Sequence, residues 1–455
     1  MPEDVDFSKR DCLLLTDIHR TLKKDEQGNV QHLRQWETTF NIVWPSLSYK
    51  ENFSLEQVPA SSLAKELYLL VVMEDEENNL IYSHMEKLKD ATPARQATVT
   101  TEKGTLTFSL NDGAATLTSY EGEDSAVTVP DTVEELPVKQ IASGAFSNKS
   151  TVEEVTLPAS LEQIGASAFY NCPITEITLP ENLRTIGYNA FCNTPLETIT
   201  LPKNVEYVAF GAFRNCYSLQ DIHCKSEAYL EKDGVLFSAD GKTLWAFPVG
   251  RYDFYEIPTG TELVATYAFA GARELTSVSF PEGLQRLEYR AFEAVNGLQE
   301  LAFPQSLQYV GQEAFLEVIS YGTDYTPADL GVITLGKNLT FVGTGAFDSF
   351  KFQGFAVEAG NPSYTAVDGC LYSADGKTLL RVPNGFVGDF TVPDTVTTLA
   401  KSAFADCKNM ASLTVGAQVT NIEQLALASS VVVRCPAGSA METYATGLGL
   451  TVEVQ

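Results

Sequence analysis

The dipeptide Ala-Phe recurs along this chain at a nearly constant interval. Several successive spacings are 22 or 23 residues, and the Phe of the pair stands at Phe146, Phe169, Phe191, Phe213, Phe269, Phe292, Phe315, Phe347 and Phe404. A fixed period of this length is typical of a solenoid, in which each repeat is one turn of a coil. The length of 455 residues by itself would suggest about three globular domains, but the repeat is the stronger evidence and favours one solenoid.

The repeats share the frame LPxxLxxIGxxAFxxCxxLxxVx. The segment that ends in Leu-Pro alternates apolar and polar residues, as in residues 174–180, and this alternation predicts a strand with one buried face. Pro has no N–H group, so it ends each strand at the same place. Leu183, Ile186 and Phe191 are then spaced to point inward from a turn and a short helical or 3₁₀ segment.

A single repeat of about 23 residues is too small to bury both its strand and its Phe, so neighbouring repeats must stack. We therefore expect a solenoid with a parallel sheet on its concave face and short helical or 3₁₀ segments on the other face. The end repeats need caps, because they would otherwise expose apolar surface.

The frame resembles the BspA-like, or Treponema-type, leucine-rich repeats of bacteria over residues 97–455. The resemblance implies a cap at about 97–128, repeats at about 129–430 and a closing cap at about 431–455 with a short helix around Ala440 to Ala445. Residues 104–122 are similar to the family's amino-terminal hairpin. Membership would imply secreted or cell-surface adhesion and protein–protein interaction.

Two Phe spacings are long because each contains the same insert. Residues 233–248 match residues 368–383 at 11 of 16 positions, within inserts at about 230–256 and 364–391. Apolar residues alternate around Ala-Asp-Gly-Lys, which predicts a β-hairpin with a tight turn. A calcium loop is the alternative, but its alternating carboxylates are missing. Thr261 stands where the frame has Leu, and Gly336 replaces Pro, so we expect an irregular solenoid between 315 and 391.

Residues 1–95 lack the frame, and we predict a separate small domain there, of unknown type and mainly β. Residues 12–44 and 67–88 each predict two strands around a polar turn, although a helix beginning near Val58 is an alternative. An effector or hydrolase with its activity in this domain, and the solenoid as a targeting arm, is the alternative function. It would need four residues to converge in one cleft: Asp17, His19, His32 and Glu37.

The charge and the cysteines restrict the partners. With 31 basic and 59 acidic residues the net charge is −28, which disfavours nucleic acid and anionic lipid. No apolar run is long enough to span a membrane, and we expect a monomer. The first 20 residues lack the basic start of a signal peptide, so the chain as written predicts a cytoplasmic protein, against the family resemblance. The eight cysteines have no CxxC spacing and predict buried thiols.

No constellation of residues identifies an enzyme or a cofactor. The four His have no HxxxH spacing, so we expect no metal site. Residues 165–169 resemble the first half of a nucleophile elbow, but other repeats have Asn or Gly in place of Ser167. The chain has no GxxxxGK[ST] loop for phosphates. A pair of carboxylates of the glycosidase kind stays open, because nothing selects one pair among many acidic residues.

A non-enzymatic recognition surface is the remaining hypothesis. In each predicted strand the side chains that alternate away from the core are short and polar, stacked at about 4.8 Å. They form the polar strip, which we expect on the concave face and which consists of Glu154, Thr156, Glu176, Thr178, Thr198, Thr200, Asp221, His223, Ser277, Ser279 and Glu300. Thr and Ser also simply suit an exposed strand face. Aromatic anchors for a protein or glycan partner stand beside the first insert, at Trp245, Tyr252, Phe254 and Tyr255.

Overall fold

The chain divides into two compact units. A computed structural model describes residues 13–24, 30–42, 67–74, 80–87, 95–111, 113–251, 253–295, 297–316, 330–348 and 352–455. One unit comprises residues 1–97 and 109–113, and the other comprises residues 98–108 and 114–455.

The first unit contains a four-stranded antiparallel sheet in the order β2-β1-β3-β4. Its strands are β1 (Leu13–Lys24), β2 (Val30–Ile42), β3 (Leu67–Glu74) and β4 (Leu80–Lys87). All four predicted strands are present. β3 occupies the end of the segment for which a helix beginning near Val58 was the alternative. Residues 58–66 lie outside the described residues. So do the side chains of Asp17, His19, His32 and Glu37, so an active site in this unit stays a hypothesis.

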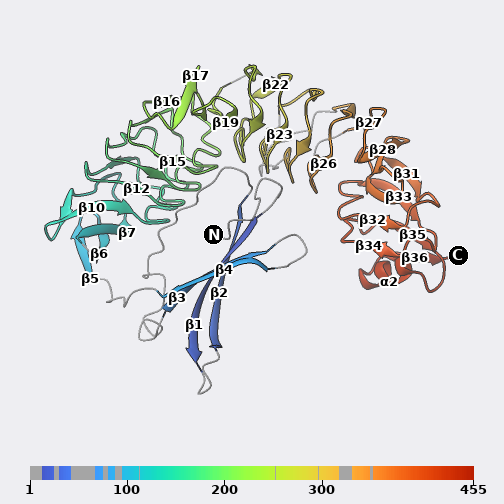
Figure 1. Cartoon of the computed structure of the whole chain (residues 1–455), viewed down its shortest axis with the longest axis horizontal. Helices are drawn as coiled ribbons and strands as arrows, with labels where there is room; N and C mark the ends of the chain where they lie inside the picture. Colours follow the sequence, from blue (N-terminus) through green and yellow to red (C-terminus); the bar gives the residue numbers. More distant parts are fainter. Residues whose placement is uncertain are drawn as a thin grey trace. The chain divides into compact units, whose positions relative to one another are not determined.

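In the second unit most repeats contribute a two-residue strand, and these strands form what we call the inner ladder. They are β12 (Gln163–Ile164), β13 (Thr185–Ile186), β15 (Tyr207–Val208), β21 (Leu263–Val264), β23 (Arg286–Leu287), β24 (Tyr309–Val310), β26 (Phe341–Val342), β32 (Thr398–Leu399) and β34 (Asn421–Ile422). Neighbouring strands pair in parallel. The inner ladder runs along the inside of the bend that this unit makes (Figure 1).

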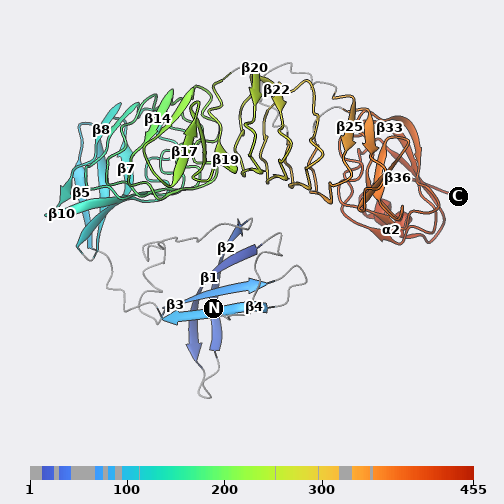
Figure 2. The same ribbon diagram turned by 45° about the horizontal axis from the view of Figure 1, so that its top comes forward.

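Most segments at the Leu-Pro position of the frame form a second set of strands, the outer ladder, on the other side of the coils (Figures 1 and 2). They are β8 (Ala126–Thr128), β11 (Glu154–Thr156), β14 (Thr198–Leu201), β16 (Asp221–Cys224), β20 (Asp253–Glu256), β22 (Leu275–Ser279), β25 (Val332–Leu335), β27 (Gly354–Val357), β31 (Val387–Thr391), β33 (Asn409–Thr414), β35 (Val432–Cys435) and β36 (Thr451–Val454). The solenoid with a parallel sheet on its concave face is confirmed. The expectation that the Leu-Pro strands build that sheet is wrong, and residues 174–180 form no strand.

The repeated Phe fills the interior of the coils, as predicted. Phe146, Phe169, Phe191 and Phe213 stack in sequence, with ring centroids 5.2–6.0 Å apart and interplanar angles of 7–12°. The first three are fully buried. The backbone N–H of Phe169 donates to the carbonyl of Ala190 in the next coil, so the same residue joins coils by a hydrogen bond and by ring packing. Removing such a ring from a core costs about 3–5 kcal/mol.

The segment around each Phe is a run of turns. Successive i+3→i hydrogen bonds of the 3₁₀ type connect Ala168 to Gly165 and Cys172 to Phe169. Ser167 and Asn171 have φ of 53° and 57°, and such left-handed residues prevent a continuous helix. Equivalent residues of the next coil, Asn189 and Asn193, take the same conformation, so the turn is a property of the repeat.

Each insert is a three-stranded antiparallel unit that joins the solenoid. The first has β17 (Tyr229–Lys232), β18 (Val235–Ser238) and β19 (Thr243–Ala246), and the second has β28 (Tyr364–Val367), β29 (Cys370–Ser373) and β30 (Thr378–Arg381). The predicted hairpins are therefore present. The last strand of each insert pairs in parallel with the inner ladder, β19 with β21 and β30 with β32. Phe247 also stacks on Phe269 at 4.6 Å, so the insert adds to the core.

Caps cover both ends of the repeats. The first contains β5 (Arg95–Thr100), β6 (Gly104–Asn111), β7 (Ala114–Gly122), β9 (Thr132–Val133) and β10 (Leu136–Ile141), and β10 continues the sheet into β12. The last contains the short helix α2 (Ala440–Gly447), whose Met441 and Ala445 are buried against the final coil. Ser439 caps α2 by accepting a hydrogen bond from the N–H of Glu442.

Candidate recognition surface

Most of the polar strip lies on the outer ladder, whereas Glu176, Thr178 and Glu300 stand at the corresponding positions of segments that form no strand. Its exposed members are Glu154, Thr156, Glu176, Thr178, Thr198, His223 and Glu300, and its half-buried members are Thr200, Asp221, Ser277 and Ser279. Val155, Ile199 and Ile222 alternate with them and are buried. The alternation is therefore real, but it does not place the polar strip on the concave face.

The first insert occupies part of the polar strip. Arg251 pairs with Asp221 at 2.7 Å, and Glu231 lies 3.2 Å from the Nδ1 atom of His223. Glu231 also accepts a hydrogen bond from the backbone N–H of Cys224 at 2.7 Å. Asp221 and His223 therefore hold the insert against β16, whereas the part of the polar strip from Glu154 to Thr198 stays open.

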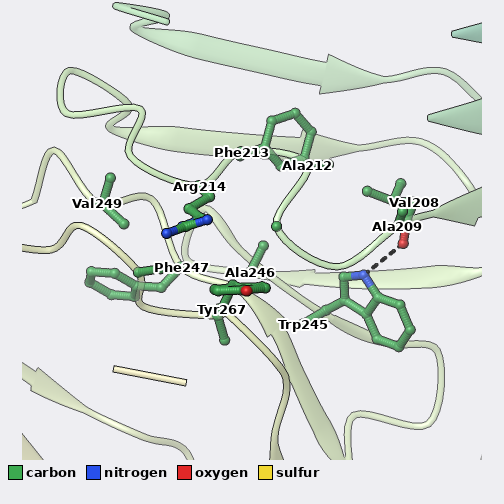
Figure 3. Close-up of a pocket in the computed structure, with 13 residues that line it drawn as sticks. Val208, Ala209, Ala212, Phe213, Arg214, Trp245, Ala246, Phe247, Val249 and Tyr267 are labelled. Atoms are coloured by element: carbon green, nitrogen blue, oxygen red, sulfur yellow. Dashed lines mark hydrogen bonds between the residues drawn. The ribbon is translucent and has the colours of Figure 1, made fainter. Parts of the chain in front are cut away.

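The four aromatic residues beside the first insert differ in position. Trp245 is half-buried, and its indole N–H donates to the carbonyl of Val208 at 3.0 Å (Figure 3). Tyr255 packs against Phe247 with centroids 4.8 Å apart, and burial raises its pKa to about 12. Phe254 is 56% exposed. Tyr252 lies outside the described residues, so Phe254 is the described aromatic of this group that is open to a partner.

A small gap lies where the first insert meets the coil of Phe213 (Figure 3). Its lining is mostly Ala and Phe, as in the rest of the core. Arg214 places its guanidinium 4.6 Å from the Tyr267 ring and pairs with the buried Glu293 at 2.5 Å. This ion pair joins the coil of Phe213 to that of Phe292, which gives it a structural role.

The inner ladder carries a row of large side chains that the sequence analysis did not single out. This aromatic row consists of Leu263, Arg286, Tyr309 and Phe341, which are partners in register on β21, β23, β24 and β26. Arg286 lies over the Tyr309 ring at 3.9 Å, and Tyr309 stacks on Phe341 at 4.7 Å with an interplanar angle of 9°. Tyr309 is 7% exposed, whereas Phe341 is 40% exposed.

Most other coils have a small or amide side chain at the same position of the inner ladder. These are Gln163 and Thr185 before β15 and Thr398 and Asn421 after the second insert, whereas β15 itself has Tyr207. The sequence signal is therefore a run of four consecutive large residues, Leu, Arg, Tyr and Phe, just before the Ile, Val or Leu of the frame. It was missed because a two-residue strand is too short to show alternation.

The described cysteines confirm the prediction of buried thiols, since six of the seven are buried and none forms a disulfide. Cys172 donates its S–H to the carbonyl of Phe146 at 2.9 Å, and Cys216 does so to Phe191 at 3.0 Å. Burial raises the pKa of Cys172 to about 11 and that of Cys216 to about 12. These thiols are protonated at neutral pH and bind one coil to the next.

No group of three or more His, Cys, Asp or Glu side chains among the described residues is arranged to hold a metal ion. None of the described helices is both long and apolar enough to cross a membrane. Ser167 occupies the left-handed turn position common to the repeats, like Asn189, which accounts for its place in the Gly-Ala-Ser-Ala-Phe segment.

A family model for the BspA type leucine rich repeat region matches residues 135–236, 250–365 and 386–442. The chain belongs to this family of BspA-type leucine-rich repeats. The match covers more than half of the chain and includes the aromatic row and the whole polar strip. Comparison with curated protein sequences finds no match.

Several solved structures are similar to this BspA-type chain. The pneumococcal vaccine antigen PcpA is 18% identical over 79% of this chain and 98% of its own, with a TM-score of 0.41. A leucine-rich repeat protein from Bacteroides ovatus is 16% identical over 78% and 99%, with a TM-score of 0.40. A leucine rich cell surface protein from Faecalibacterium prausnitzii is 22% identical over 74% and 77%, with a TM-score of 0.32.

Proposed function

We propose that this chain is a non-enzymatic recognition protein that binds a protein or glycan partner through its leucine-rich-repeat surface. The polar strip carries the proposal. Consecutive coils present short polar side chains at a regular spacing, held in place because the alternate residues are buried. An array of this kind offers an extended partner many weak, equivalent contacts, and the stacked coils need no rearrangement to make them.

The proposed role is that of a bacterial adhesin or scaffold, with the polar strip and the inserts as the contact surface. The family membership supports a role built on repeats, and the similar protein from Faecalibacterium prausnitzii is a leucine rich cell surface protein. The proposed partner is neither nucleic acid nor membrane, because a net charge of −28 repels both.

The test is affinity capture from bacterial and host extracts, followed by measurement of the Kd of the recovered partner. The strip variant replaces three exposed residues with Lys: Glu176, Thr178 and Thr198. A matched control makes the same change of charge at Asp394, Thr395 and Thr420, which are exposed far along the chain. We expect the strip variant to weaken binding at least about ten-fold. Equal binding by both variants, at unchanged melting temperatures, would exclude the polar strip.

A further inference from the structure

Phe341 is the open end of a rigid stack. Tyr309 is enclosed between Arg286 on one side and Phe341 on the other, because β24 lies between β23 and β26. β26 is the last strand of its sheet, so no further ladder strand pairs beyond the Phe341 ring. An exposed aromatic ring that is already fixed by stacking can bind a flat apolar surface with little loss of side-chain entropy.

The surface beside the aromatic row is polar and has little net charge. Gln285, Gln308 and Thr340 precede the row's residues on β23, β24 and β26, and their backbones are hydrogen-bonded in register. Gln308 and Thr340 are exposed, and Gln285 is half-buried. The residue before Leu263 is Glu262, whose backbone carbonyl accepts the hydrogen bond from Gln285. The Glu262 carboxylate is neutralised by the ammonium group of Lys242 at 2.7 Å. In a chain of net charge −28, this is a surface of amides and hydroxyls suited to an uncharged ligand.

The charge of Arg286 is also engaged within the protein. Its Nε atom donates to Glu288 at 2.8 Å while its guanidinium covers the Tyr309 ring. Glu288 is buried, so the pair is fixed in place. Arg286 therefore supports the stack and leaves the ligand to be held by ring contact and by neutral hydrogen bonds.

The backbone of the aromatic row is not available for adding a strand. β23 and β24 have a paired strand on each side. At the free edge, the N–H of Val342 already donates to the hydroxyl of Tyr364 at 2.8 Å. A peptide therefore lacks the backbone partners that it uses when it extends a sheet, and recognition here depends on side chains.

We propose that the aromatic row, together with Gln285, Gln308 and Thr340, binds a neutral glycan chain. A pyranose ring has an apolar C–H face, which packs on Phe341, and hydroxyl edges, which exchange hydrogen bonds with amides and hydroxyls. The inference rests on the proposed function, that the repeat surface recognises a partner, and it names the ligand class and a surface separate from the polar strip.

The test titrates the whole chain with three neutral probes, maltohexaose, cellohexaose and chitohexaose, and with a heparin hexasaccharide as the charged comparison. Calorimetry or saturation-transfer NMR measures the binding. We expect at least one neutral probe to bind, and Phe341→Ala to raise its Kd at least about ten-fold. Leu448→Ala is the control, because Leu448 is 55% exposed and belongs neither to the aromatic row nor to the polar strip. It should leave the Kd unchanged, as should raising the salt concentration.

Three results would overturn the proposal: binding of none of the neutral probes, a preference for the heparin fragment, or equal effects of Phe341→Ala and Leu448→Ala. The strip variant separates this proposal from the proposed function. If the strip variant loses a captured protein while glycan binding is absent, the proposed function stands without this inference. If glycan binding persists in the strip variant and fails in Phe341→Ala, the inner ladder is the glycan site.

Discussion

Thr261 is a residue whose chemistry conflicts with its place in the core. The frame has an apolar residue at this position, and Thr261 is fully buried with no hydrogen-bond partner for its hydroxyl. Val396 occupies the corresponding position after the second insert and is equally buried. The same turn bond fixes both backbones, from Thr261 to Pro258 and from Val396 to Pro393. The core therefore accepts Val after the second insert at the position where Thr stands after the first.

We predict that Thr261→Val raises the free energy of unfolding by about 1–2 kcal/mol, because it removes an unsatisfied buried hydroxyl without changing the volume. Urea unfolding followed by circular dichroism measures the change. Thr194→Val is the matched control. The Thr194 hydroxyl donates to the carbonyl of Phe191 at 2.7 Å, so this variant should lose stability. Destabilisation by Thr261→Val would mean that its hydroxyl has a partner.

Single residues also show what could be predicted at this scale. Phe169 and Phe191 were placed in the interior correctly, because each repeats at the period and has no other way to be buried. Trp245 was considered a contact anchor, whereas its ring stacks on Phe210 at 4.6 Å and its N–H bonds to Val208. Those partners come from a coil more than 30 residues away, and the local sequence contains no sign of them.

At the scale of elements, the two inserts join the inner ladder by the same device. Tyr229 and Tyr364 are the first residues of β17 and β28. Each hydroxyl accepts a hydrogen bond at 2.8 Å from the backbone N–H of the last inner-ladder residue before the insert. This residue is Val208 for the first insert and Val342 for the second. A side chain thus replaces the carbonyl that a continuing ladder would supply, which lets the ladder stop without an orphan N–H.

We predict that Tyr229→Phe costs about 1–3 kcal/mol of stability, because it leaves the Val208 N–H buried without a partner. Tyr364→Phe should cost less, since its bond to Val342 is only partly buried. Hydrogen exchange at the two amides, together with chemical unfolding, checks both variants. If the Val208 amide keeps its protection in Tyr229→Phe, the hydroxyl is not its partner.

At the scale of the whole molecule, the later part of the solenoid has two apolar cores that meet at one strand. One core extends from Val235 to Leu371, and the other from Cys370 to Ala445. Adjacent residues of β29 belong to different cores, because Leu371 lies in the first, whereas Cys370 and Tyr372 lie in the second. Since stacked coils contact mainly their neighbours, each core is expected to unfold as a unit of its own.

We predict that Leu371→Ala and Tyr372→Ala act on different parts of the molecule, although the two residues are adjacent. Leu371→Ala should lower hydrogen-exchange protection mainly in residues 263–316, and Tyr372→Ala mainly in residues 398–435, each by about 2–5 kcal/mol. Hydrogen exchange with mass spectrometry at increasing urea concentrations resolves the two regions. Equal loss of protection in both regions, for both variants, would show a single cooperative unit.

The amino-acid sequence alone determined that repeats stack with Phe inside, because a unit of this size has an apolar face that only a neighbour can cover. It also determined which strand residues face outward, through their alternation. Only the tertiary structure decided which strands form the inner ladder, since both segments of the repeat are extended and their pairing depends on contacts between coils. It likewise brought together Arg286, Tyr309 and Phe341, which lie 55 positions apart from first to last and meet only when their coils are in register.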